Sequence, residues 1–170
     1  MTKEIPIAGG LVALVDDQDY ELVSGYSWSV LSGRQTKYAV AYVRGSFPDC
    51  RRVLMHRLIM AATDGVGVDH KNRNGLDCQR GNLRLATESQ NKANTEKQRT
   101  ANGKATTSAF KGVYWHRGGR KWLAQICVDG KRRYLGLFTS ETDAAVAYNK
   151  AAIQAFGEFA RTSAIQEVAS

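Results

Sequence analysis

A polar loop of twelve residues, 71–82 (KNRNGLDCQRGN), stands between two short apolar runs and restricts how this chain can fold. The runs VGVDH and LRLAT are too short for ordinary helices, so together with the loop they predict a two-stranded antiparallel ribbon. Thr87 and Gln90 then form a T-x-x-Q capping box, which predicts a helix that carries Asn91 and Asn94. The expected order is strand, loop, strand, helix.

The segment before the ribbon predicts a β-rich region. Residues 4–44 contain four short apolar runs typical of strands, with a polar turn at 16–19 that can start a short helix. RVLMHRLIMAA then changes to a helical period, with Leu54, Leu58 and Ile59 on one face, so a helix is expected there. The N-terminal half is therefore expected to be small strands with short helices.

The segment after the ribbon changes composition twice. Residues 97–108 collect small polar side chains, which is typical of a flexible connector. Beyond them, FKGVYW, KWLAQICV and RRYLGLF predict three strands, and Asp129-Gly130 predicts a tight hairpin between the last two. Ser140 can cap a helix that ends near Gly157. The fold class is therefore α+β, and its C-terminal part is a three-stranded antiparallel sheet with one packed helix.

Charge distribution indicates the type of partner. The chain has 170 residues, a formal net charge of +8 and a pI near 9.6. The segment 92–133 contains eleven Lys or Arg against two acidic residues, which accounts for the excess. Such a segment favours a polyanion, because basic side chains displace the counterions of a phosphate backbone.

The cysteines and the apolar runs indicate the compartment. Three cysteines, widely spaced and without a C-x-x-C pair, predict neither a disulfide framework nor a zinc ribbon. No apolar run approaches the length of a membrane span, and the N-terminus lacks a signal-peptide core. We expect a protein of the cytoplasm, without membrane association.

The most reactive side chains lie in and after the ribbon. Asp69 and Asn91 offer carboxylate and amide oxygens, which are hard ligands suited to Mg²⁺ or Mn²⁺. The neutral imidazole of His70 can accept a proton from a water molecule that attacks phosphorus. If the helix packs across the end of the strand, both oxygens can reach one ion. The pattern predicts hydrolysis of phosphodiesters with one divalent metal, Mg²⁺ or Mn²⁺.

These residues resemble the HNH endonucleases of the ββα-metal class, in particular the homing-type subfamily common in phages and mobile introns. The resemblance rests on four elements in the order that the family shows. They are Asp69-His70, Asn72-Arg73-Asn74-Gly75-Leu76-Asp77, Asn82-Leu83-Arg84 and Gln90-Asn91-Lys92-Ala93-Asn94.

The resemblance implies a role for each matching position. His70 would be the general base, Asp69 and Asn91 the metal ligands, and Asn82 the residue that pins the loop. Other possible participants are His56 and Asn94 near the scissile phosphate or metal, and Lys71 and Arg73 as phosphate contacts. A single histidine at a helix start is more often structural, and loop cations are often only solvated, so these alternatives stay open.

Residues 108–163 resemble the APETALA-two/ethylene-response-factor DNA-binding domain. Matching residues include Lys111-Gly112-Val113, Trp122, Tyr134-Leu135-Gly136 and Tyr148. The family fold is a three-stranded sheet backed by one helix, and its exposed face lies in the major groove. The residues expected to contact DNA are Lys111, Tyr114, His116, Arg117, Arg120, Gln125, Arg132 and Tyr134.

The two resemblances together imply a metal-dependent, homing-type endonuclease of a phage or bacterial mobile element, in the cytoplasm of a bacterium or a phage-infected host cell. Residues 1–96 would form the HNH nuclease domain, with the ββα-metal motif at about 66–96. Residues 97–108 would be a linker, 109–163 the DNA-binding domain and 164–170 a tail. We expect double-stranded DNA as the partner, no obligate protein partner, and a tethering role for the second domain.

Two alternatives come from other functional classes. One is a non-catalytic DNA-binding transcriptional regulator with a vestigial nuclease domain. The intact Asp69, His70 and Asn91 favour the enzyme, because a vestigial site has no chemical reason to keep base and ligands together. The other is an RNA-binding structural protein, but the chain has no aromatic RNP-like motif.

Overall fold

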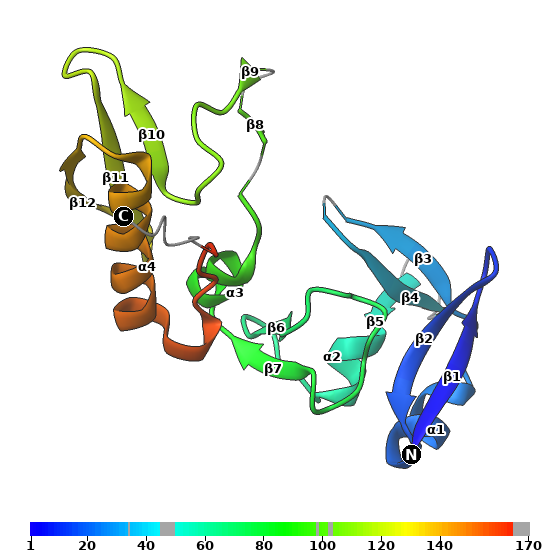
Figure 1. Ribbon diagram of the computed structural model, residues 1–170. Helices are drawn as coiled ribbons and strands as arrows, with labels where there is room; N and C mark the ends of the chain where they lie inside the picture. Colours follow the sequence, from blue (N-terminus) through cyan, green and yellow to red (C-terminus); the bar gives the residue numbers. More distant parts are fainter. Residues whose placement is uncertain (34, 45–49, 98, 102–103, 165–170) are drawn as a thin grey trace. The chain divides into compact units, whose positions relative to one another are not determined.

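The chain divides into two compact units, which are described separately. The computed structural model describes residues 1–33, 35–44, 50–97, 99–101 and 104–164 (Figure 1). By their internal contacts the units are Met1–Thr87 and Glu88–Ser170. No helix of the described residues is long and apolar enough to cross a membrane.

The first unit contains two small antiparallel sheets and a ribbon. The strands of the sheets are β1 (Thr2–Ile7) paired with β2 (Leu11–Asp16), and β3 (Ser29–Ser32), β4 (Lys37–Arg44) and β5 (Cys50–Leu54) in that order. The predicted polar turn after β2 leads into the short helix α1 (Tyr20–Ser24), as expected. The strands and α1 share one apolar core with Val15, Val23, Trp28 and Met55 almost fully buried.

The helix expected in RVLMHRLIMAA is shorter than the sequence suggested. Leu54 lies opposite Val40 in the β4–β5 pair, so the first part of this segment is strand, and α2 spans only Met55–Ile59. A short apolar run is compatible with either a strand or a helix. Here the first part of the run forms a strand, because its backbone hydrogen-bonds to β4 at the edge of the sheet. Ala61 then adopts a positive φ of 47°, which prevents the helix from continuing.

The ribbon predicted around the polar loop is present. Strands β6 (Gly67–His70) and β7 (Leu83–Ala86) pair antiparallel, with Asp69 opposite Arg84. The loop between them is bound to β2, because Leu14 N–H donates to Leu76 O and Leu14 O accepts from Cys78 N–H, both at 2.8 Å. These bonds make the loop part of the packed unit.

The second unit begins with α3 (Glu88–Asn94), the helix predicted after the ribbon. Among other contacts in this unit, it packs against α4 (Glu141–Phe156) and the 3₁₀ turn Gly157–Phe159. From the sequence, α3 is expected to belong to the nuclease domain and residues 97–108 to form a linker, and those functional boundaries stay predictions. Within that segment the described residues form a two-residue antiparallel pair, β8 (Thr100–Ala101) and β9 (Lys104–Ala105).

The C-terminal sheet has the predicted elements. Its strands are β10 (Val113–His116), β11 (Lys121–Val128) and β12 (Lys131–Phe138), in that order and antiparallel. Asp129 and Gly130 form the expected tight hairpin with φ of 50° and 77°. Ser140 caps α4, since its Oγ accepts from the N–H groups of Thr142 and Asp143. Helix α4 covers one face of the sheet.

Candidate functional site

Asp69 is a buried carboxylate held by an arginine from the neighbouring strand. Only 4% of Asp69 is exposed. Arg84, directly opposite it on β7, donates to Asp69 Oδ2 from Nε at 2.8 Å and from Nη2 at 2.7 Å. A guanidinium with two N–H groups on one oxygen both balances the buried charge and restrains the side chain. The carboxylate is therefore oriented by the ribbon itself.

The ring of His70 packs in a cluster of three rings from three elements. Its centroid lies 4.9 Å from that of His56 on α2, edge to face, and 5.8 Å from that of Tyr38 on β4. The rings of Tyr38 and His56 are 5.4 Å apart. We call Tyr38, His56 and His70 the ring cluster. It restricts the imidazole of His70 by packing on two sides.

Burial keeps both histidines of the ring cluster neutral. It lowers the pKa of His70 to about 4, against the opposing effect of the carboxylates of Asp69 and Asp77. It lowers the pKa of His56 to about 3, assisted by the positive charges that His70 and Arg57 can carry. At neutral pH His70 is therefore in the protonation state that can accept a proton. His56 Nδ1 is buried and has no hydrogen-bond partner among the described residues.

Asn82 connects two parts of the loop. Its Oδ1 accepts from Asn72 N–H at 2.9 Å, and its Nδ2 donates to Asp77 O at 2.8 Å. Asn72 in turn donates from Nδ2 to Asp77 Oδ2 at 2.6 Å. These bonds are internal to the loop, so the side chain of Asn82 acts on loop shape. The basic side chains of Lys71 and Arg73 lie exposed on the same loop.

The loop is also anchored to the rest of the first unit. Gly75 N–H donates to Thr36 Oγ1 at 2.9 Å, and a Cβ at Gly75 would overlap the Lys37 carbonyl and the Tyr38 ring. Arg80 makes a bidentate ion pair with buried Asp19, with an Nη2–Oδ1 distance of 2.7 Å. The loop therefore packs closely against Tyr38 at Gly75, and through Tyr38 it contacts the ring cluster.

The remaining predicted ligands lie on α3, in the second unit. Asn91 is half-buried and Asn94 is buried. The approach of Asn91 to the ion expected at Asp69, and with it the ββα-metal arrangement, stays a prediction. Among the described residues no group of three or more His, Cys, Asp and Glu side chains is placed to hold a metal ion. A carboxylate with amide oxygens nevertheless has the chemistry that Mg²⁺ or Mn²⁺ requires.

The sheet of the second unit has a packed face and an open face. Ala124 and Ile126 of β11 are buried, and Trp122 packs against the core cluster that contains Ala124, as the alternation predicted. The opposite positions pair Gln125 with Tyr134 and Cys127 with Arg132. We call the outward residues of the three strands, together with those of the β10–β11 turn, the outer face. From the predicted DNA contacts it contains Tyr114, His116, Arg117, Arg120, Gln125, Arg132 and Tyr134.

Lys111, the other predicted DNA contact, has its ammonium turned into the protein. The Nζ donates to three carbonyl oxygens at the end of α3, those of Lys92 at 2.9 Å, Ala93 at 2.7 Å and Thr95 at 2.8 Å. Burial and the guanidinium of Arg161 lower its pKa to about 8, so it is largely protonated at pH 7. Since an ammonium has three N–H groups, this geometry uses all of them within the protein.

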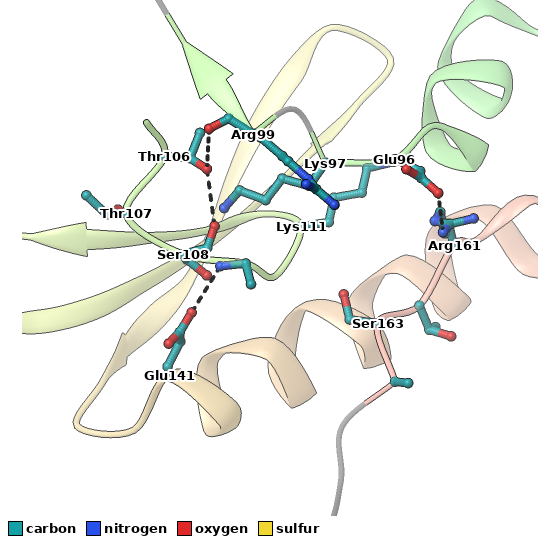
Figure 2. A pocket seen from close by; sticks show the side chains of 13 residues that line it. Glu96, Lys97, Arg99, Thr106, Thr107, Ser108, Lys111, Glu141, Arg161 and Ser163 are labelled. Carbon is teal, nitrogen blue, oxygen red and sulfur yellow. Dashed lines mark hydrogen bonds and ion pairs between the residues drawn. The ribbon is translucent and has the colours of Figure 1, made fainter. Parts of the chain in front are cut away.

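Lys111 and Lys97 line a polar pocket of about 710 Å³ in the second unit. Figure 2 shows the two lysines side by side, with the ion pair of Glu96 and Arg161 beside them. Lys97 Nζ donates at 2.7 Å to the carbonyls of Phe110 and Val113. The two lysines thus join the chain that follows α3 to the start of β10.

Arg84 was recognised only as part of the Asn82-Leu83-Arg84 element, and neither Arg84 nor Tyr38 was given a role in the site from the sequence. The pairing of Asp69 with Arg84 was accessible in principle, because a ribbon closed by the loop places opposite charges across from each other. Tyr38 had no such signal, since it lies far from His70 in sequence and its period indicates only a strand. Contact between β4 and β6 is a tertiary property.

Comparison with known proteins gives two matches. A family model described as HNH endonuclease matches residues 53–93. An uncharacterized HNH endonuclease of Acanthamoeba polyphaga mimivirus is 30% identical over 162 residues, which cover 92% of this chain and 76% of that protein. The matched family region includes the polar loop together with Asp69, His70 and Asn91.

Proposed function

Since this chain belongs to the HNH endonuclease family and is a DNA-cleaving hydrolase, we propose that it is a metal-dependent, homing-type endonuclease that cuts double-stranded DNA. The observation that carries the proposal is the pair of adjacent groups at the end of β6. There the buried carboxylate of Asp69 is oriented by Arg84, and the neutral imidazole of His70 is held in the ring cluster.

The proposed roles follow from these positions. His70 accepts the proton of the attacking water while the new oxygen–phosphorus bond forms and the bond to the leaving oxygen breaks. Asp69 and Asn91 supply oxygen ligands for one Mg²⁺ or Mn²⁺, which when bound stabilises negative charge on the phosphate oxygens. Asn82 keeps the loop in shape, and Lys71 and Arg73 contact the phosphate backbone. Asn94 and His56 are further candidates near the reacting groups.

The second unit is proposed to bind the DNA. Its outer face combines exposed cations with aromatic side chains, of which Tyr134 is 65% exposed and Tyr114 40% exposed. This composition, on a sheet backed by α4, supports an APETALA-two-like domain that lies in the major groove. Lys111 is left out of this face, because its ammonium already binds three carbonyls.

The proposal is tested by cleavage of supercoiled plasmid. We expect nicked or linear product with Mg²⁺ or Mn²⁺ and none with EDTA, and a loss of about 10²- to 10⁴-fold in rate for His70→Ala. Filter binding in EDTA should give the same DNA affinity for both proteins. Cutting that survives His70→Ala would contradict the role of His70 as general base. Cutting in the presence of EDTA would contradict the proposed metal dependence. Binding without any cutting would favour the regulator with a vestigial nuclease domain.

A further inference from the structure

Helix α3, which carries Asn91, is too short to be stable in isolation. It has only seven residues, whereas isolated helices shorter than about 12 residues are marginal in water. Its last carbonyl groups need donors from outside the helix. For Lys92 O one donor residue is the neighbouring Thr95, whose N–H and Oγ1 lie at 3.3 and 2.7 Å. The orientation of Asn91 therefore depends on what the rest of the second unit does to α3.

The last turn of α3 is held by Lys111. The three carbonyls of Lys92, Ala93 and Thr95 converge on one ammonium at 2.7–2.9 Å. A cation at the C-terminal end of a helix also interacts favourably with the helix dipole. Lys111 belongs to the segment that leads into β10, so this contact joins α3 to the sheet.

The first turn of α3 is joined to the same sheet at another point. Ser89 Oγ accepts from the N–H of Asp129, in the hairpin between β11 and β12, at 3.0 Å. Just beyond the helix, Glu96 Oε1 pairs with Arg161 Nη2 at 2.9 Å. Asn91 thus lies between the Ser89 bond on one side and the Lys111 and Glu96 contacts on the other. Hydrogen bonds therefore connect both ends of α3 to the sheet and to the segment that leads into it.

We propose that Lys111 is a positioning residue for cleavage, which sets the orientation of Asn91 by holding the end of α3 on the sheet. The predicted DNA-binding domain, residues 109–163, then contributes to cleavage as well as acting as a DNA tether. The inference rests on the proposed role of Asn91 as a metal ligand. It adds that removal of residues 109–163 slows the chemical step on bound DNA. A domain that acted only as a tether would affect DNA binding alone.

The test compares Lys111→Met with a matched loss of charge, Lys150→Met. Lys150 is exposed on α4. Single-turnover cleavage is measured at saturating DNA with Mg²⁺, and DNA affinity is measured separately in EDTA. We expect Lys111→Met to cut about 10- to 100-fold more slowly with affinity within about threefold of wild type. Lys150→Met should match wild type in rate, and Lys111→Arg, which keeps donors for the carbonyls, should recover part of the loss.

Hydrogen exchange gives a second readout. The amides of α3 should exchange faster in Lys111→Met, while those of β11 and α4 keep their protection. A wild-type cleavage rate in Lys111→Met, with Asn91→Ala inactive, overturns the positioning role alone. A wild-type rate in Asn91→Ala overturns the ligand assignment, and the positioning role with it. If Lys111→Met does not fold, Lys111→Gln, which removes the charge and keeps fewer donors, takes its place, and a wild-type rate in that variant overturns the proposal.

Discussion

The candidate catalytic side chains of the first unit and the candidate DNA contacts of the second unit lie in opposite environments. Asp69, His70 and His56 are each at most 7% exposed, and Arg84 or neighbouring rings restrain them. The outer face of the sheet is open, and Tyr134 and Arg132 extend into solvent. Chemistry requires groups that are oriented before the substrate arrives, whereas a phosphate backbone can be bound by cations that adjust. Substitutions in the first region should therefore change stability and cleavage rate, whereas substitutions in the second should change DNA affinity.

The largest effect that tests this comparison is expected at Gly75, where the loop meets the ring cluster. Gly75→Ala would press on the Lys37 carbonyl and the Tyr38 ring, and should cost about 1–3 kcal/mol of stability in the first unit. Amide hydrogen exchange in β2 and β4 measures that loss. Because Tyr38 packs on His70, the cleavage rate should fall as well.

Gly81→Ala is the matched control for that experiment. It lies on the same loop, but a Cβ there meets nothing within 4 Å. Its effect on stability should stay within about 0.5 kcal/mol. Equal destabilisation by the two variants would show that the loop does not press on the ring cluster and that its rigidity is not specific.

The next effect concerns acid stability. The pKa of His56 is about 3 in the folded protein, against about 6.5 when unfolded, so the unfolded state binds more protons between these values. The contribution of neutral His56 to the free energy of unfolding is fully present above pH 6.5. It falls as the pH decreases toward 3, by up to about 1.4 kcal/mol per pH unit. His56→Gln should therefore show a shallower loss of protection in β2 and β4 between pH 7 and pH 5. An unchanged slope would mean that His56 does not remain neutral inside the fold.

The smallest effect is expected on the outer face. Arg132→Gln should weaken DNA binding by about three- to tenfold and reduce the slope of log affinity against log salt by about 0.9, because one phosphate contact is lost. The free energy of unfolding should not change. Fluorescence anisotropy over a range of salt concentrations measures both quantities. Lys150→Gln, on α4, should leave the slope as it is, and a similar slope for both variants would remove the outer face as the DNA interface.

Local patterns were sufficient where an element depends on its own residues. The ribbon, the Asp129-Gly130 hairpin and the cap at Ser140 follow from turn and cap chemistry that acts over a few positions. The segment around Leu54 was misassigned as helix, because an apolar run of that length satisfies either period until a partner strand is known. Pairing with β4 determines that residues up to Leu54 form a strand.

By itself the sequence determined which groups are available and in what order: a carboxylate and an imidazole at a strand end, a polar loop, amides on the next helix, and a basic sheet. Only the tertiary structure decided what surrounds them. Tyr38 and His56 reach His70 through packing between distant strands and helices, and burial then lowers the pKa of that imidazole. From the sequence Lys111 is expected to contact DNA, but its ammonium binds the carbonyls of Lys92, Ala93 and Thr95 at the end of α3. Such partners are brought together by long-range contacts, which local residue patterns do not encode.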